Sequence, residues 1–100
     1  MRVIAVSTLR DFWRKHPNSA VPIGCWLDEV RHAEFKTTHA IKVMYPSASF
    51  VGKNRVVFNI GGNNFRLVVS VDYLRQAFFV KFIGTHSQYD RIDAATVDIK

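Results

Sequence analysis

Residues 55–73 read RVVFNIGGNNFRLVVSVDY and set the architecture of the whole chain. Two runs of mostly apolar residues, 55–60 and 64–73, flank the tripeptide Gly61-Gly62-Asn63. Glycine and asparagine tolerate the positive φ angles that tight hairpin turns need, so this pattern predicts a β-hairpin. Residues 76–83 form the next apolar run after a short link, and they predict a third antiparallel strand in a meander.

The sequence before the hairpin has a different period and predicts two helices. A short apolar run over residues 3–6 predicts a first strand, after which Ser7 can cap a helix. The helix has apolar and aromatic residues at helical spacing and ends before Pro17; they are Leu9, Phe12, Trp13 and His16. A second helix begins after Asn18 or Ser19, and its apolar face carries Ile23, Trp26, Leu27, Val30 and Ala33.

The remaining segments predict little regular structure. Residues 36–51 contain Pro46 and two serines, and we expect a connector with one packed turn. After the last strand, Thr85 with Gln88, or Ser87 with Asp90, can cap a short final helix that extends to about residue 93. The order of elements predicts one domain over residues 1–100, of the α+β class, with its helices packed on one face of the sheet.

Composition excludes several classes of protein. An apolar content of 48% and a charged content of 22% over 100 residues are typical of a globular domain. A single cysteine, Cys25, excludes an internal disulfide, and no Cys/His spacing indicates a structural zinc site. The opening residues are too short for a signal-peptide core, and no run approaches the ~20 apolar residues of a membrane span. We therefore expect a reduced cytoplasmic protein without a membrane association.

Positive charge is concentrated in the strand-rich part of the chain. The formal net charge is +6, and residues 35–85 hold seven basic residues against one acid, Asp72. The basic residues are Lys36, Lys42, Lys53, Arg55, Arg66, Arg75 and Lys81. This clustering favours a polyanion or an acidic protein as partner, although basic residues also serve solubility alone.

Alternation along the strands predicts where these cations point. Arg55 and Arg66 alternate with core-facing residues, and Lys81 lies between Val80 and Phe82, which we expect to face the core together with Phe78. With Lys53 on the same side, we expect one open sheet face that carries cations while the helices cover the other face. Like charges gathered in this way repel one another, and a phosphate backbone would relieve the repulsion.

The segment after the third strand carries a candidate acid or base. Gly84-Thr85-His86 follows the apolar run directly, and Tyr89 comes three residues later. Histidine titrates near neutral pH and can therefore transfer protons without a large pKa shift. A purely structural histidine remains the alternative interpretation.

Two stretches resemble a known family. Residues 58–69, FNIGGNNFRLVV, and residues 82–93, FIGTHSQYDRID, are similar to the HigB-type toxins of the RelE/ParE superfamily. The opening Arg2-Val3-Ile4 and the Tyr45-Pro46 dipeptide fit the same family. The resemblance implies a RelE-like fold, with a small, mainly antiparallel sheet, two N-terminal helices on one face and a short C-terminal helix.

The resemblance also implies a function. Such toxins are mRNA interferases of type II toxin–antitoxin systems: they are endoribonucleases that inhibit translation by cutting mRNA, commonly in the A site of the 30S ribosomal subunit. The implied partner is a helix-turn-helix antitoxin of the HigA type. ParE-like members of the same fold act on gyrase, so a gyrase-inhibiting toxin remains an alternative, as does a noncatalytic RNA-binding module.

Residue by residue, the family's basic positions fall on Lys53, Arg55 and Arg66, and its polar and aromatic positions fall on His86 and Tyr89. We expect a metal-free reaction without a cofactor, in which a ribose 2′-hydroxyl attacks the adjacent phosphate, because the sequence lacks a carboxylate cluster for a two-metal nuclease. Arg66 would bind the scissile phosphate in a bidentate manner. Lys53 and Arg55 are also expected in the catalytic site, where they would hold flanking phosphates and one of them would assist proton removal if its pKa were depressed. His86 would act as general acid or base, and Tyr89 would stack on a base or donate a hydrogen bond. The expected RNA contacts are Lys53, Arg55, Arg66, Arg75 and Lys81.

Overall fold

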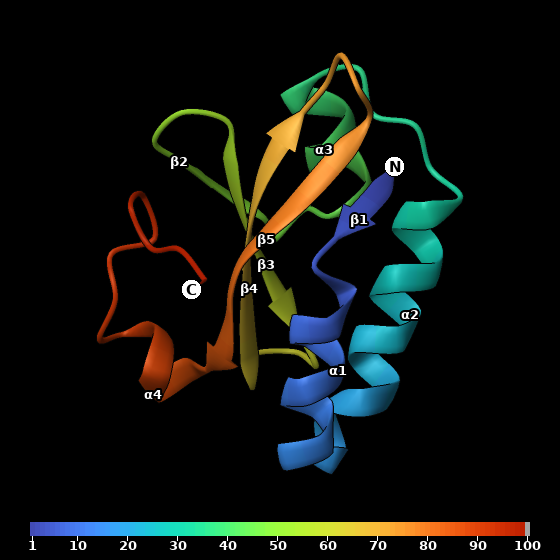
Figure 1. Ribbon diagram of the computed structural model, residues 1–100. Coiled ribbons are helices and arrows are strands. Elements are labelled where there is room, and N and C mark those ends of the chain that lie inside the picture. Colours follow the sequence, from blue (N-terminus) through green and yellow to red (C-terminus); the bar gives the residue numbers. More distant parts are fainter. Residues whose placement is uncertain (100) are drawn as a thin grey trace.

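A five-stranded sheet forms the centre of the computed structural model, which describes residues 1–99 (Figure 1). The strand order is β1-β5-β4-β3-β2, in which β1 and β5 are parallel and the other neighbours are antiparallel. The strands are β1 (Arg2–Ile4), β2 (Ser49–Val51), β3 (Arg55–Ile60), β4 (Phe65–Asp72) and β5 (Ala77–Thr85). The predicted meander is confirmed as β3, β4 and β5.

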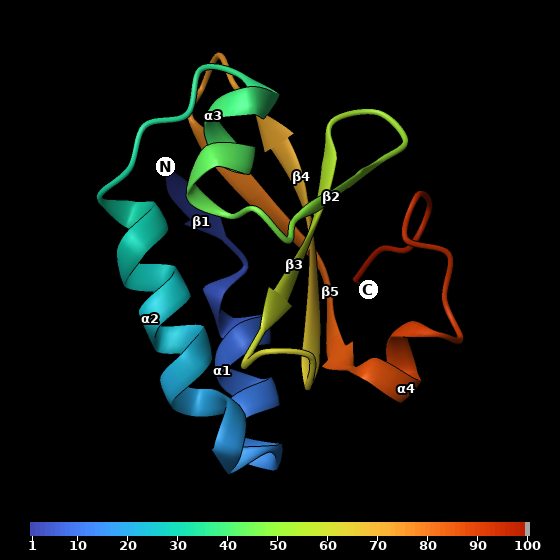
Figure 2. The ribbon, with the colours of Figure 1, turned by 180° about the vertical axis from the view of Figure 1, so that it is seen from behind.

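The helices lie mainly on one side of this sheet. They are α1 (Val6–Lys15), α2 (Ala20–Arg31), α3 (Thr38–Met44) and α4 (His86–Tyr89), and a 3₁₀ turn (Pro17–Ser19) separates α1 from α2. Both views show α1 and α2 side by side against one face, whereas α4 follows β5 at the far end of that strand (Figures 1 and 2). The predicted α+β arrangement is therefore confirmed. Across residues 1–99, every helix is too short or too polar to cross a membrane.

The main core lies between α1, α2 and the sheet. Leu9 and Phe12 of α1 and Ile23 and Val30 of α2 are buried, as the helical spacing predicts. Their partners on the sheet include Phe58, Leu67, Val69 and Phe78. Burial of one such side chain contributes about 1.5–3 kcal/mol, so these layers hold the helices on the sheet.

The predicted cap of the first helix is wrong, whereas Ser19 holds the predicted N-cap position of the second helix without a side-chain cap bond. Helix α1 begins at Val6, and the preceding residue is Ala5, whose φ of 74° turns the chain directly from β1 into the helix. Ser7 therefore lies inside the first turn. Ser19 precedes α2, but its hydroxyl donates to the carbonyl oxygen of His16 (2.7 Å) and makes no cap bond.

The predicted connector over residues 36–51 is also wrong, because it contains α3 and β2. Thr37 starts the helix by accepting a hydrogen bond from the Ala40 N–H at its hydroxyl (3.1 Å), and Ile41 is fully buried beneath it. After β2, Gly52 and Asn54 take positive φ angles of 54° and 56°. This turn joins β2 to β3 in a hairpin at the edge of the sheet. Strand β2 has only three residues, which is too short to give a clear alternating pattern in the sequence.

A β-bulge in β5 changes which side its residues face. Val68 pairs with Phe82 and Val69 pairs with Val80, so Lys81 is an extra residue without a partner across the ladder. The predicted inward direction of Phe82 is therefore wrong. Its ring packs with Val57 and Val68 on the face opposite the main core, which we call the second face.

Tyr45, at the end of α3, contacts Glu29 of α2, and its ionisation should lower the stability of the fold at alkaline pH. Its hydroxyl donates to Glu29 Oε1 (2.7 Å), and its ring packs edge-on against Phe58 with centroids 5.1 Å apart. Burial raises the pKa of Tyr45, and the hydrogen bond to Glu29 and the charge of Glu29 raise it further. An unfolded tyrosine ionises near pH 10. The folded state therefore keeps its proton where the unfolded state loses it, and stability should fall as the pH rises through about 10.

We expect Tyr45→Phe to remove this part of the pH dependence. At pH 8 the variant should lose on the order of 1 kcal/mol of unfolding free energy, because one hydrogen bond is gone. Above pH 10 the difference between wild type and variant should shrink. Urea unfolding at pH 8 and pH 10.5 measures both values; a constant difference would show that ionisation of Tyr45 does not limit stability.

Candidate nucleic-acid interface

Three predicted site residues meet at one end of the sheet. The β3–β4 loop lies beside the start of α4, because the Asn64 carbonyl oxygen accepts a hydrogen bond from the His86 N–H (3.1 Å). We call the group Arg66, His86 and Tyr89 the hairpin corner. It joins the end of the hairpin to the short helix that follows β5.

The helix of the hairpin corner is fixed by a capping box. The Gln88 N–H donates to the Thr85 hydroxyl (3.2 Å), and the Thr85 N–H donates to Gln88 Oε1 (2.8 Å). The predicted Thr85–Gln88 cap is thus confirmed. The helix ends at Tyr89, earlier than the expected end near residue 93.

Arg66 lies near the start of β4 on the second face. It pairs with Asn59 of β3 on one side and with Gly84 of β5 on the other. Its Nη1 donates to the carbonyl oxygens of Asn63 (3.0 Å) and Phe65 (3.2 Å), which anchors the guanidinium to the hairpin loop. Within residues 1–99 the other guanidinium nitrogens make no hydrogen bond that would compete with a phosphate, and a guanidinium matches phosphate geometry.

His86 is exposed and has an acidic neighbour. Its side chain is 54% exposed, and its Nδ1 lies 3.2 Å from Oδ2 of Asp90. A carboxylate next to one ring nitrogen leaves the other nitrogen available to a substrate. Sequence reasoning did not assign this contact to Asp90, although the i,i+4 spacing within the predicted helix could have indicated it.

An aromatic pair borders the hairpin corner on the second face. The rings of Phe82 and Tyr89 lie with centroids 6.4 Å apart. The Phe82 ring also covers Gly84, where an added Cβ would lie only 2.5 Å from the ring and 2.9 Å from Gln88 Oε1. A side chain at position 84 would therefore displace the Phe82 ring or the Gln88 side chain, and Gly84 is the residue that pairs with Arg66 across the ladder.

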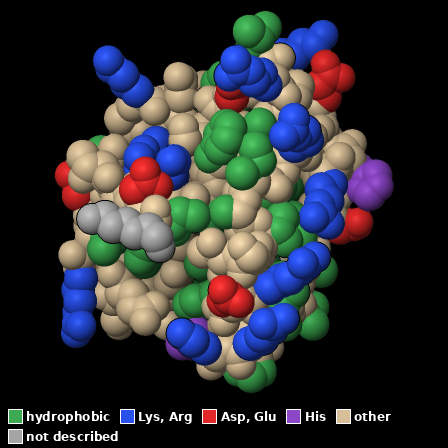
Figure 3. All heavy atoms as spheres, viewed as in Figure 1, with side chains coloured by type: hydrophobic (Ala, Val, Ile, Leu, Met, Phe, Trp, Pro, Cys, Tyr) green, Lys and Arg blue, Asp and Glu red, His purple; other side chains and the backbone are tan. Residues whose placement is uncertain are grey.

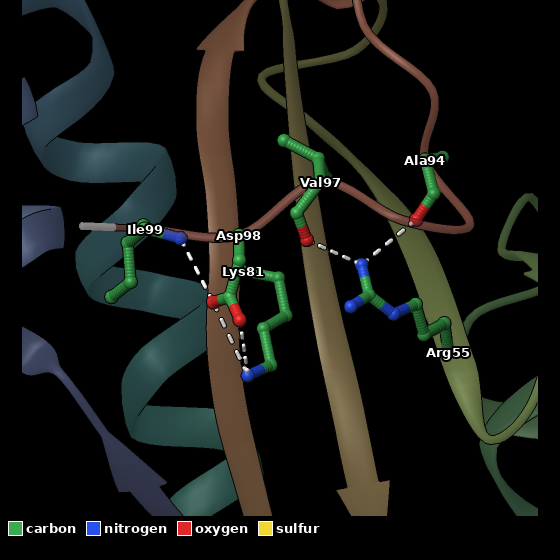
Figure 4. Close-up of polar contacts among 6 residues, drawn as sticks. All are labelled: Arg55, Lys81, Ala94, Val97, Asp98 and Ile99. Carbon is green, nitrogen blue, oxygen red and sulfur yellow. Dashed lines mark hydrogen bonds and ion pairs between the residues drawn. The ribbon is translucent and has the colours of Figure 1, made fainter.

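The second face is not open, so the prediction of one exposed cationic face is wrong. The chain after α4 crosses this face, as Figure 4 shows. Arg55 Nη1 donates to the carbonyl oxygens of Ala94 (3.1 Å) and Val97 (2.6 Å), and Lys81 Nζ donates to Asp98 Oδ1 (3.3 Å). Both cations already have internal acceptors.

Lys53 and Arg75 lie at the end of the sheet opposite the hairpin corner. Lys53 is in the β2–β3 turn, next to Asn54, whose carbonyl oxygen accepts a hydrogen bond from the Val71 N–H (2.7 Å). Val71 is five residues along β4 from Arg66, or about 17 Å. Arg75 is in the β4–β5 turn, where its N–H donates to Asp72 Oδ1 (3.0 Å) and, with the guanidinium, holds the pKa of Asp72 below its usual value.

The charge distribution follows from these positions. Figure 3, which has the view of Figure 1, shows Lys and Arg side chains spread from top to bottom of the molecule, with acidic side chains between them. In the described part of the chain, no three His, Cys, Asp or Glu residues form a group that could hold a metal ion. The hairpin corner is therefore the place where the predicted residues come together, and it offers a cation, an imidazole and a phenol.

The fold and this corner together define a small, basic, RelE-like α+β domain. The family model for HigB toxins, the RelE-like toxic component of a toxin–antitoxin system, matches residues 19–92. The chain therefore belongs to the HigB toxin family, and the resemblance noted in the sequence is confirmed.

Two relatives extend the comparison over most of the chain. The mRNA interferase HigB of Escherichia coli O6:H1 (strain CFT073) is 28% identical over 94 residues, which cover 92% of this chain and 91% of that protein. The mRNA interferase toxin HigB of Escherichia coli strain K12 is 28% identical over 93 residues, with 90% and 88% covered. The likeness thus spans both the helices and the hairpin corner.

Proposed function

We propose that this toxin cleaves mRNA and that the hairpin corner is its catalytic site. The observation that carries the proposal is the meeting of Arg66, His86 and Tyr89 at one end of the sheet, where the His86 side chain is exposed. Membership in the HigB toxin family and the names of the relatives, which are mRNA interferases, support RNA as the substrate.

In the proposed reaction, the 2′-oxygen of a ribose forms a bond to the adjacent phosphorus as its proton leaves. The P–O5′ bond breaks, and the departing oxygen takes up a proton. Negative charge on the phosphate oxygens increases in the transition state, and Arg66 stabilises it through guanidinium nitrogens that the hairpin loop does not use. Preorganised donors of this kind are most effective because they need no rearrangement during the reaction.

His86 carries one of the two proton transfers, either from the 2′-hydroxyl or to the 5′-oxygen. Because Asp90 lies next to Nδ1 of His86, Nε2 is the nitrogen that exchanges a proton with the substrate. Tyr89 stacks on a base or donates a hydrogen bond, and the neighbouring Phe82 ring extends that aromatic surface. Lys53 and Arg75 lie far along the sheet, which favours a role in holding the transcript over a role at the scissile bond.

The partners in this proposal are mRNA in the ribosomal A site and a HigA-type antitoxin, in the cytoplasm where translation occurs. A net charge of +6 supports a polyanionic partner, since phosphate contacts dominate the affinity of nucleic-acid-binding proteins. Family membership supports an antitoxin, because the family comprises toxic components of toxin–antitoxin systems.

The chemistry of the RNA ends tests the proposal. After induction of the toxin, new mRNA fragments should carry a 5′-hydroxyl and a 2′,3′-cyclic phosphate, because the attacking nucleophile is the ribose itself. Polynucleotide kinase should then label the 5′ ends without prior phosphatase treatment. Fragments with 5′-phosphates would contradict the mechanism, and DNA damage without RNA fragments would indicate a gyrase-inhibiting toxin instead.

A further inference from the structure

The chain after α4 occupies the second face as a separate segment. We call residues Ile92–Ile99 the strap. The strap forms no strand with the sheet, and its internal backbone hydrogen bonds run from Thr96 and Val97 to the carbonyl oxygen of Asp93. It is therefore held on the sheet by side-chain contacts and not by a ladder of backbone bonds.

The polar contacts of the strap use cations of the sheet. Arg55 binds the carbonyl oxygens of Ala94 and Val97, and Lys81 binds the carboxylate of Asp98 (Figure 4). The hydrogen bond from Lys81 is the main cause that lowers the pKa of Asp98. The Asp98 side chain is still 51% exposed, so water competes for this ion pair.

The apolar contacts of the strap are small. Ala94 is buried against Val57 and Val68, and Ile92 and Val97 are partly buried in the same cluster. This cluster is much smaller than the main core on the other face. The free energy that holds the strap down is correspondingly modest, since stabilisation scales with the apolar area removed from water.

We propose that the strap is an internal competitor for RNA: it covers Arg55 and Lys81 in the free toxin and is displaced when a transcript binds along the second face. This inference rests on the proposed function. It explains why Arg55 and Lys81 are bound to carbonyl and carboxylate oxygens of the strap, which the anionic oxygens of an RNA phosphate can replace as acceptors. The strap therefore sets the affinity for RNA from beside the hairpin corner, which it adjoins where the Ile92 N–H donates to the Tyr89 carbonyl oxygen (3.2 Å).

The path beneath the strap is continuous with the hairpin corner. Arg55 pairs with Ser70, which is four residues, or about 13 Å, along β4 from Arg66. The Phe82 ring, next to Tyr89, lies on the same face. A single strand of RNA combines phosphates for such cations with bases for such rings, and this combination favours RNA over an acidic peptide.

A disulfide lock tests whether the strap must leave. An ideal Cβ on Gly52 would lie 3.4 Å from Cβ of Ala95, close to the ~3.5–4.5 Å of disulfides. The protein would carry Gly52→Cys and Ala95→Cys with the exposed Cys25→Ser. The matched control is Gly52→Cys with Cys25→Ser, which has the same strain at a positive φ but forms no lock.

The probe is a mixed-sequence 2′-O-methyl oligoribonucleotide, which binds but cannot react through its 2′-oxygen. We expect the oxidised lock to bind it more weakly than the reduced lock, with a smaller salt dependence. Each phosphate contact on single strands contributes ~0.7 to the slope of log K against log salt, so the loss of Arg55 and Lys81 should lower the slope by ~1.4. The affinity of the control for the probe, and its salt dependence, should be the same before and after reduction.

Weakening the strap should have the opposite effect. Asp98→Asn removes the Lys81 ion pair and should bind the probe more tightly than Asp28→Asn, which makes the same charge change on the exposed surface of α2. Removal of residues 93–100 should also tighten binding if the shortened chain folds by circular dichroism. Asp98→Asn tests the proposal regardless of that result.

The outcomes separate the strap from the proposed function. Equal slopes for the oxidised and reduced lock, together with equal affinities of Asp98→Asn and Asp28→Asn, overturn the strap proposal and leave mRNA cleavage intact. If the oxidised lock weakens the binding of a protein partner but not of the probe, the strap proposal is also overturned, because the strap then competes with a protein and not with RNA. If no form binds the probe and induced cells show no RNA fragments, both the strap proposal and the proposed function fail.

Discussion

Arg66→Ala is expected to lower the rate of mRNA cleavage by on the order of 10²–10³-fold, because one preorganised donor to the developing phosphate charge is lost. Arg66→Lys should recover only part of the rate, since an ammonium keeps the charge but lacks the planar pair of donors. Cleavage is measured by mapping fragment ends in induced cells, and toxicity by growth after induction.

The matched control for Arg66 is Arg10→Ala. Arg10 is an exposed arginine of α1, on the side of the sheet opposite the second face, and its loss changes the net charge equally. Arg10→Ala should remain toxic. The side chain of Arg66 also binds two carbonyl oxygens of the hairpin, so a thermal melt must show that Arg66→Ala is folded. A folded Arg66→Ala that still cuts at the wild-type rate would remove Arg66 from the catalytic site.

His86→Ala should reduce cleavage by on the order of 10²–10⁴-fold, the usual contribution of a positioned acid or base. His86→Gln can still make a hydrogen bond but cannot exchange a proton at neutral pH, so it should be nearly as slow as the alanine variant. Added imidazole should partly restore cleavage by purified His86→Ala, because the small base can enter the exposed space that the side chain leaves.

His39→Ala is the control for His86, because His39 is an exposed histidine on α3. It should cleave at the wild-type rate and gain nothing from imidazole. The proton-transfer role would be rejected if His86→Gln were fully active. A purely structural role would appear as a lower melting temperature and no response to imidazole.

Short-range signals in the sequence were sufficient for much of the fold. The turn at Gly61-Gly62-Asn63 and the capping box of Thr85 and Gln88 depend on residues within a few positions of each other. The period of the apolar residues in α1 and α2 likewise follows from one helical face. These elements form as predicted because local preference and tertiary packing agree at each of them.

The predictions from sequence are wrong where contacts with a distant part of the chain determine the environment of a residue. The strap covers Arg55 through carbonyl oxygens about forty residues away, and no local pattern around Arg55 indicates this contact. The apolar residues Ile92, Ala94 and Val97 were the available signal that this segment packs against something. Helix α3 was missed because Pro46 and nearby serines obscured the Thr37 cap and the buried Ile41.

The candidate site residues fall into two groups, those that the structure brings together and those that it separates. Arg66, His86 and Tyr89 come together because a hairpin and the strand after it must bring Asn64 and His86 to one end of the sheet. Lys53 and Arg75 separate from them because turns at the other end carry both residues. The sequence places residues on a face by alternation, but alternation does not give the distance along that face.

The bulge at Lys81 affects how this strand is compared with others. The residues on both sides of Lys81 alternate as they would in a strand one residue shorter: Val80 and Ile83 face the main core, and Phe82 faces away from it. Lys81 is thus the extra residue of the bulge, and the alternation of sides is offset by one position beyond it. An ungapped alignment to a relative that lacks this residue would assign the wrong side to every position on one side of it, so a gap belongs at position 81.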